Sequence, residues 1–293
     1  MVRFLRVFFF LLAFGASAAA ASTPVVAQSS LSEKLTEILK EAQRAEAQRL
    51  YERAIELYQQ VLNTGVSDAA QRRELLKLRA VAYERTNELI KAEIDLTDAI
   101  NVEPVDPLAY ADRGYFYLRR GRYPDALDDF VAGSRLAPTA AAFQYGAGRV
   151  LVAMRNDLGA VALYNEAISL DPNDGANYLA RAEARVRLKQ FDEAVADYTR
   201  ALKLRLKTVN DWFFAYLGRG YARMVRDQND GAVQDFDEAL RLIPKDLQAL
   251  TWRGLAHERR GDIEQAIEDY ERAYQFAPRD AWVRTSLQRL RSY

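Results

Sequence analysis

Residues 107–138 read PLAYADRGYFYLRRGRYPDALDDFVAGSRLAP, and this stretch decides the fold. Two apolar stripes with a helical period lie on either side of Gly121 and Arg122. Pro138 ends the second stripe, because proline has no N–H to donate and clashes with the preceding helical turn. The stretch therefore predicts two helices joined by a tight turn, each with one apolar face. One such hairpin cannot bury both faces, whereas a stack of hairpins can.

The same pattern recurs along the chain, in units that begin near residues 35, 73, 107, 141, 175, 213 and 247. Position 20 of every unit is alanine, and position 24 is aromatic or leucine. The alanines are Ala54, Ala92, Ala126, Ala160, Ala194, Ala232 and Ala266. The turns of the fourth and sixth units are the most degenerate, since Arg155-Asn156-Asp157 and Asp227-Gln228-Asn229 stand where the third unit has Gly121-Arg122-Tyr123. A single period held this long predicts a repeat array.

The unit resembles the tetratricopeptide repeat (TPR), which carries an aromatic residue, glycine, tyrosine, alanine, phenylalanine and proline at these offsets within 34 residues. In residues 107–138 the matching residues are Tyr110, Gly114, Tyr117, Ala126, Phe130 and Pro138. The resemblance implies an all-α, right-handed superhelical solenoid of about seven helix-turn-helix units. We expect the TPR array at residues 35–280 and a C-terminal cap helix at residues 281–293, where arginines surround an apolar stripe.

The N-terminus has the three parts of a secretory signal peptide. Arg3 and Arg6 precede an apolar run from Val7 to Phe14, and small residues follow. We expect cleavage between residues 18 and 27, then a linker at 28–34 and an exported protein, in a bacterial periplasm. The alternative is an uncleaved anchor in the inner membrane, facing the periplasm, since residues 7–27 carry no charge. Membrane attachment is expected only in that case.

Composition argues against several classes of function. Lys plus Arg and Asp plus Glu both number 41, so there is no basic excess of the kind that binds nucleic acid. The chain has no cysteine and one histidine, His257, which stands where other units have tyrosine. No motif gathers the groups that catalysis or metal binding requires. We therefore expect no enzymatic activity, no catalytic residues, no metal and no cofactor.

Two positions of the unit vary together. Position 7 is arginine in five units, and position 23 is aspartate in the same five. The other two units lack both residues. Because position 7 lies on the first helix and position 23 on the second, we predict a structural ion pair across each hairpin. The pairs are Arg79–Asp95, Arg113–Asp129, Arg181–Asp197, Arg219–Asp235 and Arg253–Asp269.

The resemblance places the binding surface on the first helices, mainly at positions 2, 5, 9 and 12, which share one helical face. In units three to six this face is mostly apolar and aromatic, with Arg149 and Glu183 as isolated charges. The candidate groove residues are Leu108, Tyr115, Tyr145, Arg149, Leu179, Glu183, Phe214, Leu217 and Tyr221. Any one of them has the alternative of burial between adjacent first helices.

An apolar groove with a polar rim is typical of a surface that binds a peptide or helix. We therefore predict a scaffold or adaptor of the cell envelope whose partner is another protein, without nucleic acid. The alternatives are an accessory protein of polysaccharide export or envelope biogenesis, binding glycan or enzyme partners, and a membrane-anchored assembly factor. The carboxylate clamp of some TPR co-chaperones needs Lys and Asn at positions 5 and 9. That combination is absent here, since Val81 follows Lys77 and Arg149 follows Tyr145.

Overall fold

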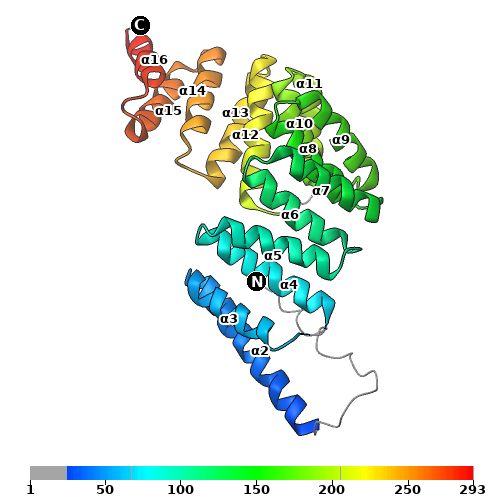
Figure 1. Ribbon diagram of the computed structural model, residues 1–293. Coiled ribbons are helices and arrows are strands. Elements are labelled where there is room, and N and C mark those ends of the chain that lie inside the picture. The colour runs from blue at the N-terminus through cyan, green and yellow to red at the C-terminus, as the bar shows by residue number, and fades with distance from the viewer. Residues whose placement is uncertain (1–24, 67, 205, 293) are drawn as a thin grey trace. The chain divides into compact units, whose positions relative to one another are not determined.

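The computed structural model describes residues 25–66, 68–204 and 206–292 of the chain (Figure 1). Helices and turns make up these residues, and no strand occurs among them. The predicted all-α array of about seven helical hairpins is confirmed. Most of the predicted signal peptide, residues 1–24, lies outside the described part.

The chain divides into two compact bodies, residues 1–120 and 121–293, which we call the N-terminal and C-terminal bodies. The N-terminal body contains α2 (Val25–Ala47), α3 (Tyr51–Asn63), α4 (Ala69–Arg85), α5 (Leu89–Val102) and α6 (Pro107–Arg119). The C-terminal body contains α7 (Tyr123–Leu136), α8 (Ala141–Ala153), α9 (Asp157–Leu170), α10 (Gly175–Arg187), α11 (Phe191–Lys203), α12 (Val209–Val225), α13 (Asn229–Leu242), α14 (Leu247–Arg260), α15 (Ile263–Phe276) and α16 (Ala281–Arg291). Even-numbered helices up to α14 are the first helices of repeats, and α16 occupies the place expected for the cap helix.

Helix α2 begins earlier than the sequence suggested. It starts at Val25 and so covers residues 28–34, for which we expected a linker. The physical reason is that residues 25–64 contain neither glycine nor proline, while Pro24 stands directly before the helix, where proline is tolerated. The short polar residues of this segment are too weak a signal to end a helix by themselves.

Aspartates begin many of the first helices. The side chains of Asp68, Asp106, Asp174, Asp246 and Asp280 each accept a hydrogen bond from a backbone N–H in the first turn, at 2.7–3.0 Å. Helix α12 instead begins with a capping box, in which Thr208 and Asp211 bond to each other's backbone N–H. Such caps satisfy donors that the helix leaves open, and they fix where these helices start.

The turn inside each repeat has one conformation throughout. Position 15 is left-handed in all seven repeats, at Arg49, Asn87, Gly121, Arg155, Lys189, Asp227 and Gly261, with φ between 57° and 88°. The turns that look irregular in sequence therefore adopt the same backbone as the glycine turns. Arginine, lysine and aspartate hold a conformation there that costs non-glycine residues free energy.

Within each body, the core forms between the two helices of a repeat. The alanine at position 20 is fully buried in every repeat, and the ring or leucine at position 24 is at most 4% exposed. In repeats that lie within one body, glycine or alanine at position 8 makes room for the side chain at position 24. A Cβ added to Gly148 would lie 2.5 Å from Tyr164, and one added to Gly254 would lie 2.7 Å from Tyr270. In the described part of the chain, no helix is long and apolar enough to span a bilayer.

Candidate functional site

The predicted arginine–aspartate pairs form in four repeats. Nε and Nη2 of the arginine donate to the two carboxylate oxygens in Arg79–Asp95, Arg181–Asp197, Arg219–Asp235 and Arg253–Asp269, at 2.5–3.1 Å. The aspartates are at most 4% exposed. Two planar groups held by parallel hydrogen bonds make a specific link between the helices of one hairpin. Arg113 and Asp129 lie in different bodies, so this fifth pair stays a prediction.

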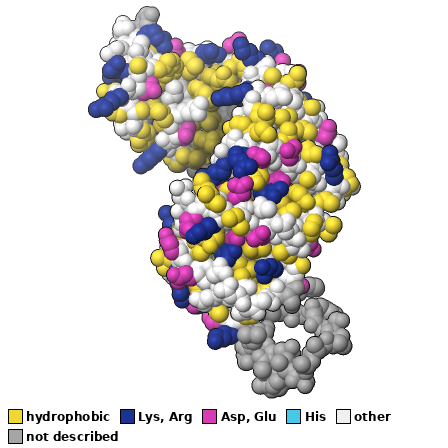
Figure 2. Space-filling view, in the orientation of Figure 1, with side chains coloured by type: hydrophobic (Ala, Val, Ile, Leu, Met, Phe, Trp, Pro, Cys, Tyr) yellow, Lys and Arg dark blue, Asp and Glu magenta, His cyan; other side chains and the backbone are white. Residues whose placement is uncertain are grey.

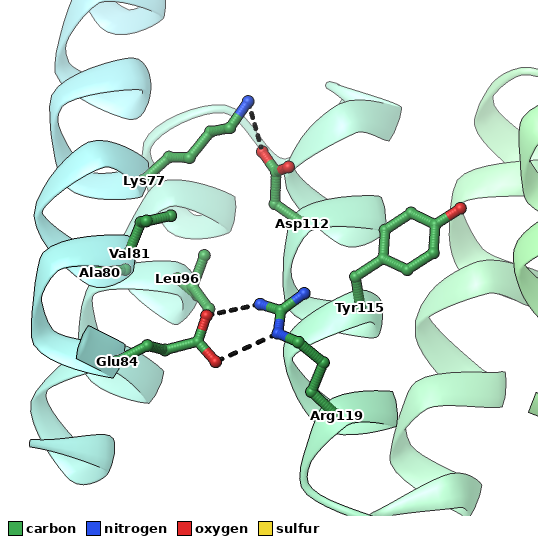
Figure 3. A pocket seen from close by; sticks show the side chains of 8 residues that line it. All are labelled: Lys77, Ala80, Val81, Glu84, Leu96, Asp112, Tyr115 and Arg119. Atoms are coloured by element: carbon green, nitrogen blue, oxygen red, sulfur yellow. Dashed lines mark hydrogen bonds and ion pairs between the residues drawn. The ribbon is translucent and has the colours of Figure 1, made fainter. Parts of the chain in front are cut away.

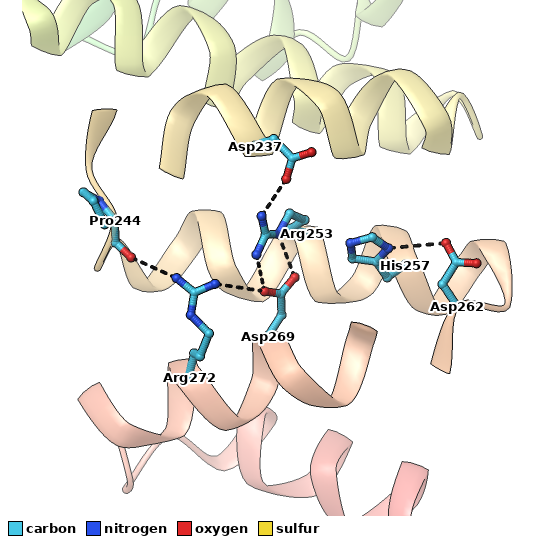
Figure 4. A network of polar contacts seen from close by, with 7 residues as sticks. All are labelled: Asp237, Pro244, Arg253, His257, Asp262, Asp269 and Arg272. Carbon is cyan, nitrogen blue, oxygen red and sulfur yellow. Dashed lines mark hydrogen bonds and ion pairs between the residues drawn. The ribbon is translucent and has the colours of Figure 1, made fainter. Parts of the chain in front are cut away.

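The remaining guanidinium nitrogen of each arginine, Nη1, bonds to the preceding repeat, a contact that our sequence reasoning missed. Nη1 of Arg253 donates to Asp237 at 2.5 Å (Figure 4). The equivalent acceptors are Gln59 for Arg79, Thr97 for Arg113, Asn165 for Arg181 and Thr199 for Arg219. All five acceptors stand at position 25 of the preceding repeat. Each of the five arginines therefore joins two neighbouring repeats, and four of them also join the two helices of their own hairpin.

A sequence signal for this contact exists. When a repeat has arginine at position 7, the repeat before it has a side-chain oxygen at position 25. The fourth repeat has Ala147 at position 7, and the third repeat, directly before it, has Val131 at position 25. This correlation assigns the arginines a structural role. His257, one turn further along α14, is half-buried and pairs separately with Asp262, with Nδ1 3.4 Å from Oδ2 (Figure 4).

In the N-terminal body, the first helices α4 and α6 line a pocket of about 180 Å³ (Figure 3). Ala80, Val81 and Leu96 supply its apolar part, and Tyr115, a predicted groove residue, contributes from α6. Leu108, the other predicted groove residue of this body, is 56% exposed near the start of α6.

Ion pairs flank the pocket at two places. Lys77 on α4 lies 3.4 Å from Asp112 on α6, and Glu84 on α4 accepts hydrogen bonds from Arg119 (Figure 3). Burial raises the pKa of the Asp112 carboxyl, and Lys77 opposes that effect. Lys77 stands at the clamp position 5, and its ammonium is already engaged by Asp112 and by Glu74 at 3.7 Å.

Two of the predicted groove residues of the C-terminal body belong to the core. Leu179 is 8% exposed and Leu217 is 5% exposed, so neither offers an open surface. Helix α10, which carries Leu179, packs against α8 and α12, and α12, which carries Leu217, packs against α10 and α14. These neighbours cover leucines at position 5 that a single isolated helix would expose. The interpretation of Leu179 and Leu217 as groove residues was wrong.

The remaining predicted residues of this body keep accessible surface. Arg149 and Glu183 are exposed, Phe214 is 50% exposed, and Tyr145 and Tyr221 are half-buried. Tyr145 packs on Tyr164 of α9, with ring centroids 6.0 Å apart. Tyr221 packs on Trp252 of α14 at 4.7 Å and 31° between planes. Our sequence analysis missed Trp252, which stands at position 6 and extends this aromatic surface to the next first helix.

Glu183 has unusual electrostatics for an exposed residue. Desolvation by surrounding protein raises the pKa of its carboxyl, and attraction by Arg187 and Arg149 does not offset this effect. Burial raises the pKa of the Tyr145 hydroxyl as well. Among the described residues, no group of three or more metal-ligating side chains comes together.

Comparison with known proteins agrees with this geometry. Models of the tetratricopeptide repeat match residues 111–175, 176–208 and 217–281, more than half of the chain. Hsp70-Hsp90 organizing protein 1 of Glycine max is 28% identical over 155 residues, which are 45% of this chain and 27% of that protein. The chain therefore spans only about a quarter of that relative.

Two solved structures share the fold. YrrB, a TPR protein with an unusual peptide-binding site, is 21% identical and aligns over 66% of this chain and 96% of its own, with a TM-score of 0.56. PilW, a type IV pilus biogenesis factor, is 17% identical and aligns over 74% of this chain and 97% of its own, with a TM-score of 0.61. The chain belongs to the tetratricopeptide repeat family, a class of protein-interaction scaffolds.

Proposed function

We propose that this protein is a non-catalytic scaffold or adaptor that binds a peptide or helical segment of another protein on the first helices of its repeats. The pocket between α4 and α6 carries the proposal. A cavity of about 150 Å³ holds a benzene molecule. The pocket of about 180 Å³ therefore has room for one aromatic or branched aliphatic side chain of a partner.

The composition of the pocket supports binding of a side chain rather than catalysis. Its charged groups are already paired with one another, so they form a polar rim around the apolar part. A buried apolar contact surrounded by a polar rim is the usual arrangement at the centre of a protein interface. On the face of the molecule seen in Figure 2, basic and acidic side chains are interspersed, unlike the single-sign surface that binds nucleic acid.

The test compares two arginine substitutions in the N-terminal body. Val81→Arg places a long charged side chain in the pocket at a site that is already 39% exposed, whereas Ile94→Arg places it on the second helix α5, at a site that is 53% exposed. The full chain with a C-terminal tag is cross-linked in cells, and captured proteins are identified by mass spectrometry. We expect one partner to be retained by Ile94→Arg and lost from Val81→Arg. Equal retention by both variants, or no captured protein at all, would contradict the proposal.

We also propose that the protein is exported to a bacterial periplasm. The support is the sequence of residues 3–22, where two arginines precede an apolar run and a stretch of small residues. Mass spectrometry of the intact protein after cell fractionation tests this proposal. A mature N-terminus between residues 19 and 28 in the periplasmic fraction is the expected result. An intact N-terminus in the membrane fraction would favour the anchored alternative, and one in the cytoplasm would contradict export.

A further inference from the structure

Glu183 differs from the carboxylates on the first helices α4, α6, α12 and α14. In α4, α6, α12 and α14 the acidic side chains have partners: Glu74 with Lys77, Glu84 with Arg119, Asp112 with Lys77, Asp211 with the Thr208 N–H, and Glu258 with Arg289. Within residues 25–66, 68–204 and 206–292, Glu183 makes no hydrogen bond and no ion pair. It is the one acidic residue of α10.

The surroundings of Glu183 make this lack of a partner costly. Protein atoms displace much of the water around the carboxylate, which raises its pKa. A charged group that loses water without gaining a hydrogen bond destabilises the folded state. The nearby Arg187 is directed elsewhere, since its Nε donates to Asp157 at 2.6 Å. Asp211 adds repulsion to the site.

The position of Glu183 is suited to contact with a partner. It stands at position 9 of its repeat, the position that Tyr221 occupies on α12, and α10 packs against both α8 and α12. Tyr145 on α8 lies within electrostatic reach of Glu183, because the charge of Glu183 contributes to raising the pKa of the Tyr145 hydroxyl. Both groups also contribute to raising the pKa of Tyr164. Glu183 as a residue is exposed, and the flanking first helices carry the half-buried rings of Tyr145 and Tyr221.

From this arrangement we infer that the C-terminal body recognises a lysine or arginine side chain of the bound segment, through an ion pair with Glu183 beside the ring of Tyr145. The inference rests on the proposed function, because it names the chemistry of a segment bound on the first helices. A guanidinium or ammonium group supplies the hydrogen bonds that Glu183 lacks. An adjacent apolar side chain of the segment covers the tyrosine ring.

The test is selection of random internal dodecapeptides displayed on phage, with the full chain as the target. Glu183→Gln keeps the shape of the side chain and removes its charge. Glu166→Gln is the matched control, since Glu166 is exposed on the second helix α9. We expect the wild type and the control variant to enrich peptides with Lys or Arg next to an apolar residue, and Glu183→Gln to lose that preference. Substituting citrulline for arginine in a selected peptide should weaken binding about tenfold or more, as for other hydrogen bonds to charged groups.

The outcomes separate the two claims. Enrichment of peptides without a basic residue, or an unchanged basic preference with Glu183→Gln, would overturn the inference and leave peptide binding intact. If no peptide is enriched on any variant, both the inference and the proposed function fail. Circular dichroism of each variant shows that the helices are intact, so that a lost preference reports on recognition.

Discussion

Replacing Arg253 by alanine should destabilise the last repeats by about 3 kcal/mol. Asp269 is 2% exposed and receives hydrogen bonds from Nε and Nη2 of Arg253 at 2.8 and 2.5 Å. Removing one partner of a buried pair costs roughly 3–5 kcal/mol, because the other charge stays buried. We expect the lower end of that range, since Arg272 remains 3.9 Å from the Asp269 carboxylate (Figure 4).

The chain itself supplies the compensating change. The fourth repeat has Ala147 and Leu163 at the two positions, and it forms the same hairpin. The double variant Arg253→Ala with Asp269→Leu copies that solution and leaves no buried charge. The free energy of unfolding of the double variant should therefore lie within about 2 kcal/mol of the wild-type value. The two substitutions should then show a coupling energy above about 1 kcal/mol. Asp237→Asn serves as a control, because this carboxylate is 52% exposed and should contribute less than about 1 kcal/mol.

Urea unfolding followed by tryptophan fluorescence measures these differences. Trp252 precedes Arg253 in α14, and Trp282 packs on Tyr270 with ring centroids 5.3 Å apart, so two of the three tryptophans report on this region. Circular dichroism in parallel shows whether the array unfolds in one step, which the free energies require. A cost below about 1 kcal/mol for Arg253→Ala, or simple additivity of the two substitutions, would refute the reasoning.

Three further predictions concern packing, the turns and pH. Gly146→Ala should cost about 1–3 kcal/mol in thermal unfolding, because its Cβ would lie 2.4 Å from the ring of Phe130, whereas Gly231→Ala, with its nearest atom at 3.3 Å, should be near neutral. Lys189→Gly should stabilise by up to about 1 kcal/mol, because φ is 60° there; a loss of stability would contradict the strain argument. Glu183 should titrate above the ordinary glutamate pKa in NMR. The folded state favours the protonated form of Glu183, so stability is highest below the unfolded pKa and is lost as pH rises through the folded pKa. Glu183→Gln removes the charge and should therefore raise Tm more at pH 7 than at pH 4.

The sequence was sufficient for the repeat architecture and for the helix-to-helix arginine pairs. Both depend on side chains that recur at one spacing, and packing enforces that spacing in every repeat. Ala126 and Phe130 show the reason, since each is almost completely buried and neither position tolerates a larger side chain without a shift of the helices. The pairs were readable because Arg181 and Asp197 lie within one repeat, at a constant separation.

Features that involve two repeats were harder to predict. Leu179 is covered by neighbouring first helices, and periodicity along one helix carries no information about them. The bond from Arg253 to Asp237 was missed because the equivalent acceptor varies among four residue types in the array: glutamine, asparagine, threonine and aspartate. The pocket near Val81 depends on how closely α4 and α6 approach, and no residue pattern gives that distance.

The bonds from arginine Nη1 to the preceding repeat imply that cooling and heating destabilise different parts of the C-terminal body. Between α9 and α15 each repeat is joined to the next by an arginine, whereas at the α7–α8 junction Phe143 fills the space at Gly133, and Phe130 fills that at Gly146. Apolar contacts weaken on cooling, while the cost of removing water from charges falls as temperature rises. The α7–α8 junction is therefore the place where this body should first loosen in the cold, and the arginine-linked repeats should be the last to separate on warming.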